Sequence, residues 1–342
     1  MSDPPIDSRH DRLNVLVWHV HGSWTTSFVQ GEHTYLVPTD PALGSWALGR
    51  CGRSWPDRAI EIAPADLVDT RVDAVVLQRP RELDLVREWL GREPGSEIPA
   101  VYVEHNTPRE HAARTRHPLA DRTDIPLVHV TDFNNLMWDN GCCPTVVIPH
   151  GVLDPGYRYS GELPRAATSI NEPLRRWRVT GTDLLSPLSD AAPIDVYGIA
   201  TENLHHPLHS TPDRIQGCGD LNQAALHREL ARHRMFVHTP RWTSLGLSLI
   251  EAMYLGMPVV AVGTAEAALS VPAEAGIVST DLGILAEAMR QLLAEPAFAE
   301  LTGKYARQWA RATFGIDAFV RRWDELLTAQ VFDTRPTAIP TG

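Results

Sequence analysis

Residues 234–263 read RMFVHTPRWTSLGLSLIEAMYLGMPVVAVG and predict a strand, a helix and a second strand in close succession. The apolar run 235–238 is typical of a buried strand, and the run 245–255, rich in Leu, Ile, Ala and Met, is typical of a helix. Gly256 ends this helix, and residues 258–262, which begin with Pro, predict the next strand after a short turn. Such a unit offers the N–H groups at the start of its helix to a phosphate.

The length and composition of the chain favour two α/β domains of medium size. Its 342 residues, 43% of them hydrophobic, are enough to fill two cores. The net charge of −11 argues against a nucleic acid or an anionic membrane as the main partner, because both need an excess of Lys and Arg. No apolar run reaches the roughly 18 to 20 residues of a membrane span, and the start, MSDPPIDSRHDR, lacks the core of a signal peptide. The four cysteines show no C-x-x-C spacing, which favours reduced thiols in a cytoplasmic protein.

The first half of the chain alternates short apolar runs with polar and helical segments. The runs that predict strands are residues 13–20, 73–77, 99–103, 126–130 and 145–148, and residues 81–90 predict an amphipathic helix. This alternation implies a doubly wound parallel sheet, whose ligands bind beyond the carboxyl ends of the strands. His21 and His105 follow two of these predicted strands, and we therefore expect both near a ligand.

The second half repeats the alternation after a turn-rich stretch, residues 151–168, which we interpret as the connection between two domains. Strands are predicted at 194–197 and 275–278, besides the two in the opening stretch, and helices at 222–233, from 282, at 298–314 and at 316–329. The last residues, rich in Pro and Thr, predict a disordered tail.

The segment 243–260 resembles the donor-binding signature of the retaining, family 4 type of glycosyltransferases (glycosyl transferases group 1), which have the GT-B fold. That signature contains two glutamates eight positions apart. Glu251 matches the second glutamate, whereas Thr243 stands in place of the first, and a Thr side chain supplies no carboxylate charge. The other positions in register are Gly246, Ala252, Gly256, Pro258 and Val259.

An arginine-rich segment, residues 175–185, resembles the stretch whose basic residues hold the donor diphosphate in this family. Thr180 occupies the position of the family's lysine, so Arg176 or Arg178 has to carry that charge. Three more segments support the resemblance, which covers most of residues 13–328: 147–152, which resembles the entry to the second domain, 104–107, which resembles the histidine loop, and 21–22, which resembles the first glycine loop.

The resemblance implies an α/β protein of the GT-B fold, with two Rossmann-like, doubly wound parallel-sheet domains that face each other across a cleft. Residues 1–150 would form the acceptor domain and residues 151–315 the domain that binds the nucleotide-sugar donor. We expect the helix 316–330 to pack back on the first domain and residues 331–342 to form a tail.

The resemblance also assigns candidate residues to each part of the site. A carboxylate inside an apolar helix is costly to bury without partners, and the ribose hydroxyls of a nucleotide would be suitable partners for Glu251. A solvated helix face or a structural ion pair is the alternative for this residue. The candidates are His105 and Thr243 for catalysis; Glu251, Ser244, Leu245, Gly246, Arg176, Arg178 and Gly22 for the donor; and His21, Ser23, Trp24 and Asn106 for the acceptor.

The activity implied by the resemblance is transfer of a sugar from a nucleoside diphosphate sugar to a small-molecule acceptor, as in natural-product biosynthesis, with retention and without metal or cofactor. His205, His206 and His209 lack a carboxylate or cysteine partner at ligand spacing, which argues against a metal site. Two alternatives remain: a nucleotide-sugar epimerase or phosphorylase-like enzyme of the same fold, and a non-catalytic protein that binds a nucleotide sugar. The sequence does not identify the nucleotide base, the donor sugar or the acceptor. It does not identify the oligomeric state either.

Overall fold

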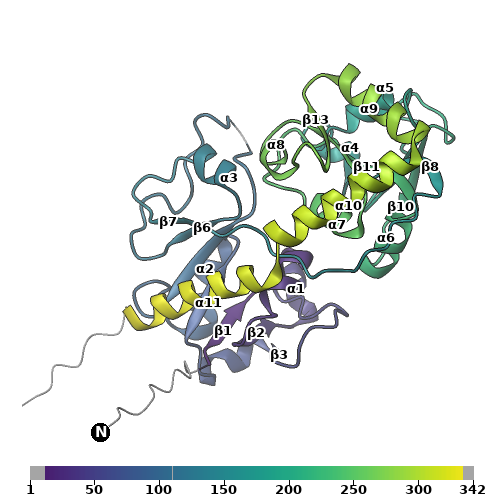
Figure 1. The fold of residues 1–342 in the computed structure, drawn as a ribbon. Coiled ribbons are helices and arrows are strands. Elements are labelled where there is room, and N and C mark those ends of the chain that lie inside the picture. The colour runs from purple at the N-terminus through teal and green to yellow at the C-terminus, as the bar shows by residue number, and fades with distance from the viewer. Residues whose placement is uncertain (1–11, 110, 334–342) are drawn as a thin grey trace, which may run out of the picture.

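The computed structural model of the protein describes residues 12–109 and 111–333, which form two α/β lobes (Figure 1). The predictions made for residues 1–11 and for the tail from 334 onward lie outside the described residues. Within the described part of the chain, no helix has both the length and the apolar character that crossing a membrane requires.

The first lobe is built on a seven-stranded sheet in the order β3-β2-β1-β4-β5-β6-β7, and all of its strand pairs are parallel. In chain order the strands are β1 (Asn14–Val17), β2 (Thr34–Pro38), β3 (Ala59–Ile62), β4 (Ala74–Leu77), β5 (Ala100–Glu104), β6 (Leu127–His129) and β7 (Thr145–Val147). The strand order reverses between β1 and β4, and the crevice of an open α/β sheet lies at the carboxyl ends of the strands at such a reversal.

The second lobe contains a six-stranded parallel sheet in the order β10-β9-β8-β11-β12-β13. Its strands are β8 (Leu163–Ser169), β9 (Ile194–Tyr197), β10 (Ile215–Gly219), β11 (His233–His238), β12 (Val259–Val262) and β13 (Gly276–Ser279). Here the order reverses between β8 and β11, so the second crevice opens beside residues 234–263. Two parallel-sheet α/β domains confirm the predicted fold class.

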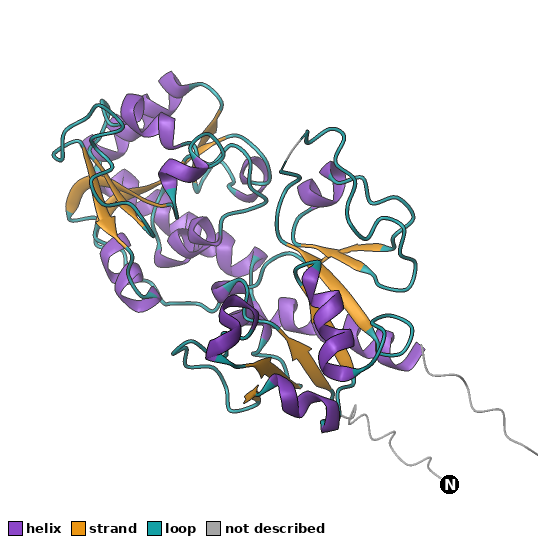
Figure 2. Ribbon diagram, turned by 180° about the vertical axis from the view of Figure 1, so that it is seen from behind, coloured by secondary structure: helices purple, strands orange, loops and turns teal. Residues whose placement is uncertain are grey.

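Helices pack on both sides of each sheet (Figure 2). The first lobe contains α1 (Gly22–Phe28), α2 (Arg81–Leu90), α3 (Asp132–Met137) and the 3-10 helices η1 (Pro41–Trp46) and η2 (Pro64–Asp69). The second contains α4 (Pro173–Arg176), η3 (Thr182–Leu184), α5 (Leu185–Leu188), α6 (Gln223–Leu230), α7 (Leu247–Leu255), α8 (Ala267–Ser270), α9 (Leu282–Ala294) and α10 (Pro296–Thr313). Successive residues of a strand point to opposite faces, so Phe236 and Val237 of β11 belong to the two different cores of this lobe.

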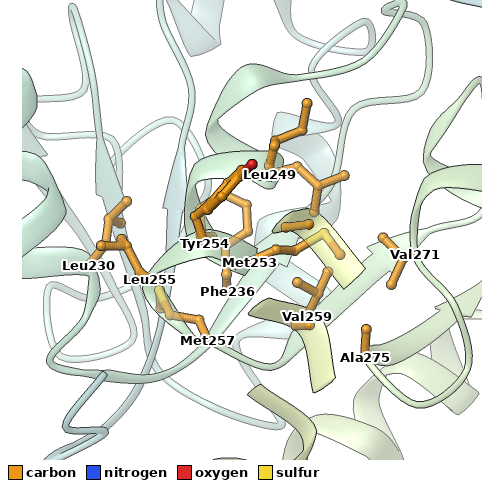
Figure 3. Packing of buried hydrophobic residues seen from close by; sticks show 14 of the residues in the cluster. Leu230, Phe236, Leu249, Met253, Tyr254, Leu255, Met257, Val259, Val271 and Ala275 are labelled. Atoms are coloured by element: carbon orange, nitrogen blue, oxygen red, sulfur yellow. The ribbon is translucent and has the colours of Figure 1, made fainter. Parts of the chain in front are cut away.

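The apolar side chains of helix α7 pack in a core of the second lobe, and Figure 3 shows several of them with residues of the neighbouring strands. Every residue from Leu249 to Leu255 is buried, and the apolar side chains among them pack with those of β11 and β12, including Phe236 and Val259. The helix ends at Gly256, which has the left-handed φ of 90° that favours glycine. A helix that is apolar all round is stable only when it is enclosed in this way. The enclosed helix therefore holds its own N-terminus in a fixed position.

The last helix, α11 (Ile316–Asp333), leaves the second lobe and runs along the first (Figure 1). Its apolar residues belong to the core of the first lobe, and the Trp323 ring lies edge-on to Trp24 and Phe28, at centroid distances of 5.6 and 5.1 Å. The helix includes residues 331–333, which were expected in the tail, because Val331 is buried in the same core.

Four strands lie where the sequence analysis predicts none: β2, β3, β8 and β10. The clearest difference is β8, which falls in the stretch interpreted as the domain connection. This strand is central in its sheet, but Pro164, Arg165 and two alanines give it no continuous run of large apolar residues. The neighbouring strands β9 and β11 contribute the larger side chains of the two cores. The small side chains of Ala166 and Ala167 are therefore enough to fill the space left beside them.

Candidate functional site

A cavity of about 790 Å³ lies between the two lobes. Its wall on the first lobe comes from residues that follow β1, β5 and β7, and its wall on the second from residues that follow β8, β9, β10 and β11. Both strand reversals therefore open into one cavity. This arrangement suits a ligand that reaches from one lobe to the other.

The start of α7 forms part of the second wall. Ser244, Leu245 and Gly246 line the cavity together with the first helical residues, Leu247 and Ser248. Gly246 is the N-cap, and among the described residues no side chain makes a capping hydrogen bond to the helix. The first N–H groups of a helix have no partner within the helix and carry its positive end, so this wall offers hydrogen-bond donors to an anion.

Arg176, the last residue of α4, lines the cavity. Within residues 12–109 and 111–333, its side chain has no ion pair and no hydrogen bond. Burial, and then the neighbouring charge of Arg175, lower the pKa of Arg176 below its ordinary value. Arg175 also lines the cavity, but its Nε donates to Oε1 of Glu172 at 2.8 Å. Arg176 is thus a partly buried cation that makes no ion pair among the described residues, and the only carboxylate whose charge acts on it there, that of Glu172, is already paired with Arg175.

Arg178, the other predicted diphosphate ligand, lies outside the cavity lining. Its side chain is 71% exposed and pairs with Asp183 at 3.1 Å. Arg109 takes a place that the sequence analysis did not foresee, since it lines the cavity from the loop after β5 and its charge contributes to the lowered pKa of Arg176. Cations from both lobes therefore face the same space.

Glu251 is buried in α7, at 4% exposure, and lines the cavity. Its Oε1 accepts hydrogen bonds from Ser23 Oγ at 3.3 Å and Gln223 Nε2 at 3.0 Å, and its Oε2 lies 3.2 Å from His227 Nε2. The bond from Ser23 crosses between the lobes, from α1 to α7. The carboxylate is therefore neither on a solvated helix face nor without partners.

Three histidines line the wall on the first lobe. The rings of His21 and His105 lie 4.1 Å apart, and His150 stacks on His105 at 6.5 Å. Gln78 Nε2 donates to Trp18 O, so its Oε1 faces His105 and accepts from His105 Nε2 at 3.0 Å. Burial lowers the pKa of His21 to about 4, that of His150 to about 3, and that of His105 well below its ordinary value. These rings are neutral at pH 7 and are suited to bind hydroxyl groups.

The remaining predicted residues divide into two groups. Ser23, Asn106 and Thr243 line the cavity. Trp24 and Gly22 are outside its lining: Trp24 is 1% exposed in the core of the first lobe, and a side chain at Gly22 would meet Arg53. A residue one position along a helix points in a different direction, which explains why Trp24 is in the core although Ser23 faces the cavity.

Hydrogen bonds at the cavity rim join the lobes. Ser244 Oγ donates to the backbone oxygen of His105 at 2.7 Å, and Trp242 Nε1 donates to that of Pro108 at 2.7 Å. These bonds join the loop between β11 and α7 to the loop after β5. They therefore fix the position of the α7 N-terminus relative to the three histidines of the first lobe.

Comparisons with known proteins agree with this architecture. Residues 188–295 match the sequence family described as glycosyl transferases group 1. No curated protein matches the chain in sequence. Among solved structures, sucrose-phosphate synthase from Thermosynechococcus elongatus superposes with a TM-score of 0.71 at 15% identity, covering 95% of this chain and 100% of that chain.

Two further structures are similar over nearly the whole chain. HepE from Anabaena in complex with UDP-glucose has a TM-score of 0.69 at 15% identity, covering 93% of this chain and 100% of that chain. A glycosyltransferase from Rickettsia africae has a TM-score of 0.62 at 14% identity, covering 95% of this chain and 100% of that chain. The fold shared with these proteins is GT-B, and the match to the group 1 glycosyl transferases, over residues 188–295, lies in the second lobe of this fold.

Proposed function

We propose that the protein is a glycosyltransferase that moves a sugar from a nucleoside diphosphate sugar to a small-molecule acceptor. The observation that carries the proposal is a partly buried cation, Arg176, which makes no ion pair among the described residues and lies in the same cavity as the N-terminus of α7. Two positive groups facing one space need an anion of more than one charge, and a diphosphate meets that need. UDP-glucose bound to HepE makes a UDP-sugar the first donor to test.

In this proposal the second lobe holds the donor. The α7 N-terminus and Arg176 bind the diphosphate, and Glu251 binds the ribose. The hydrogen bond from Ser23 to Glu251 is long, at 3.3 Å, so a ribose hydroxyl is able to replace Ser23 as the donor to this carboxylate. Arg178 has no part in the site because it is exposed and paired with Asp183.

The first lobe holds the acceptor against its histidine wall. The rings of His21 and His105 are neutral. Together with Ser23 and Asn106 they supply hydrogen bonds for the hydroxyl groups of an acceptor. When the bond between the sugar and the diphosphate breaks, negative charge grows on the diphosphate, and Arg176 with the α7 N-terminus stabilises it. We propose that this leaving group takes the proton of the acceptor on the same face of the sugar, which retains the anomeric configuration, and that the two positive groups serve in place of a metal ion.

A second candidate function is nucleotide-sugar binding without catalysis. The residue that favours it is Thr243, which lines the cavity where the resemblance would place a carboxylate. A third, epimerase-like or phosphorylase-like chemistry, would act on the donor without an organic acceptor.

Incubation with UDP-glucose, alone and with a panel of hydroxylated acceptors, separates these functions by product analysis. Transfer or slow hydrolysis supports the glycosyltransferase, a changed sugar without an acceptor supports the epimerase, and binding without turnover supports the non-catalytic protein. Glu251→Gln should lower turnover, while Glu287→Gln, at an exposed carboxylate on α9, should leave it unchanged. If Glu251→Gln has the same turnover as the wild type, Glu251 has no part in the site.

A further inference from the structure

His238, the last residue of β11, lines the cavity but has no part in the donor site described above. The side chain is 4% exposed. If Gly246 carried a Cβ atom, that atom would lie 2.8 Å from Cε1 of the His238 ring. The ring therefore lies against the backbone of Gly246, which is the N-cap of α7.

The ring of His238 has no hydrogen-bond partner among residues 12–109 and 111–333. The ring nitrogens are not among the fully enclosed polar atoms of the described residues, so they open to the cavity, where a ligand is able to supply the partner that the protein does not. His105, on the opposite wall, differs in this respect because it bonds to Gln78. His238 is thus a donor that faces the cavity beside the α7 N-terminus and has no acceptor among the described residues.

The charge state of the ring suits an anion that is already held by other groups. Burial lowers the pKa of His238 to about 4, so at pH 7 the ring is neutral and carries one N–H group and one lone pair. A neutral ring lies beside the positive end of α7 without repulsion, and its N–H group adds a directed hydrogen bond.

We propose that His238 donates a hydrogen bond from its ring to the diphosphate of the donor, and so completes the site formed by the α7 N-terminus and Arg176. This inference rests on the proposed function, because it requires a nucleotide in the cavity. Phosphate oxygens only accept hydrogen bonds, so they match the N–H group of the neutral ring. An aromatic side chain without nitrogen would fill the space beside Gly246 but would make no such bond.

Calorimetric titration of the wild type, His238→Phe, His238→Asn and His238→Gln with UDP and with uridine tests the inference. His238→Phe should lose about tenfold or more of the UDP affinity, since the lost bond is made to a charged group. Its affinity for uridine should stay within about twofold of the wild type, because uridine has no phosphate. Asn or Gln, which keep an N–H donor, should recover part of the loss, and His206→Phe, at an exposed loop position, should behave as the wild type.

Unchanged UDP affinity in His238→Phe would overturn the inference, and so would an equal loss of UDP and uridine affinity, which would mean general damage to the cavity. Should His238→Phe fail to fold, the wild type labelled with ¹⁵N-histidine gives a second measurement. The ring signal that is missing from His238→Gln should shift on addition of UDP and not of uridine; a signal that stays in place would overturn the inference. A wild type that binds none of UDP, GDP and ADP would instead overturn the proposed function, and this inference with it.

Discussion

Lowering the pH from 7.5 to 5.5 should destabilise the folded protein, because several histidines are buried in neutral form. Burial lowers the pKa of His21, His129 and His238 to about 4, that of His150 to about 3 and that of His105 well below the ordinary value of 6.5. The unfolded chain takes up protons at these residues below pH 6.5, whereas the folded chain does so only near pH 4 and below. The stability they contribute is therefore complete above pH 6.5 and is lost as the pH falls.

The size of the effect follows from the same values. Between pH 7.5 and 5.5 each of these histidines lowers the free energy of unfolding by about 1.3 kcal/mol, so the five together lower it by about 6 to 7 kcal/mol. A loss of this size lowers the midpoint of urea unfolding by about 1 M or more. Tryptophan fluorescence reports the transition, since the chain contains 10 tryptophans.

A matched pair of variants assigns the effect to particular residues. His150→Asn should reduce the pH dependence by about a fifth, because it removes one of the five groups. His206→Asn, at an exposed position, should leave the pH dependence unchanged. A wild type that is equally stable at pH 7.5 and 5.5, or more stable at 5.5, would refute the reasoning.

Three further predictions concern the donor site and the last helix. Arg176→Gln should weaken UDP binding about 10- to 100-fold in calorimetry, and Arg178→Gln should leave it nearly unchanged; equal effects would contradict the assignment of the diphosphate to Arg176. Gly246→Ala should also weaken UDP binding, measured in the same way, because its Cβ would displace the His238 ring, and wild-type affinity would count against this packing. Trp323→Ala should lower the free energy of unfolding by about 3–5 kcal/mol in urea, whereas Arg321→Ala on the exposed side of α11 should not; a small effect of Trp323→Ala would mean that the first lobe folds without α11.

The fold could be predicted from the sequence wherever a strand is a continuous apolar run. The strands β1, β4, β5 and β11 are of this kind, and so is the buried helix α7. The strand β8 could not be predicted, because its buried residues are small and its ends carry Pro and Arg. Tertiary contacts, and not local preference, make that segment a strand.

The site could be predicted to the extent that it depends on position along a strand. His21, His105 and Ser244 follow strands, so they lie at the carboxyl edges that face the cavity. The direction of each side chain depends on packing that the sequence does not display, and for that reason Trp24 lies in the core. Arg109 and His238 were missed because neither belongs to a recognisable pattern, although both line the cavity.

The central claim is that the cavity holds a nucleoside diphosphate through its phosphates, and calorimetric titration of the wild type tests it most directly. UDP, GDP and ADP are each compared with the corresponding nucleoside at pH 7.5. At least one diphosphate should bind about tenfold or more tightly than its nucleoside, because Arg176 and the α7 N-terminus bind only the phosphates. Equal affinities for diphosphate and nucleoside, or no binding of any diphosphate, would contradict the claim.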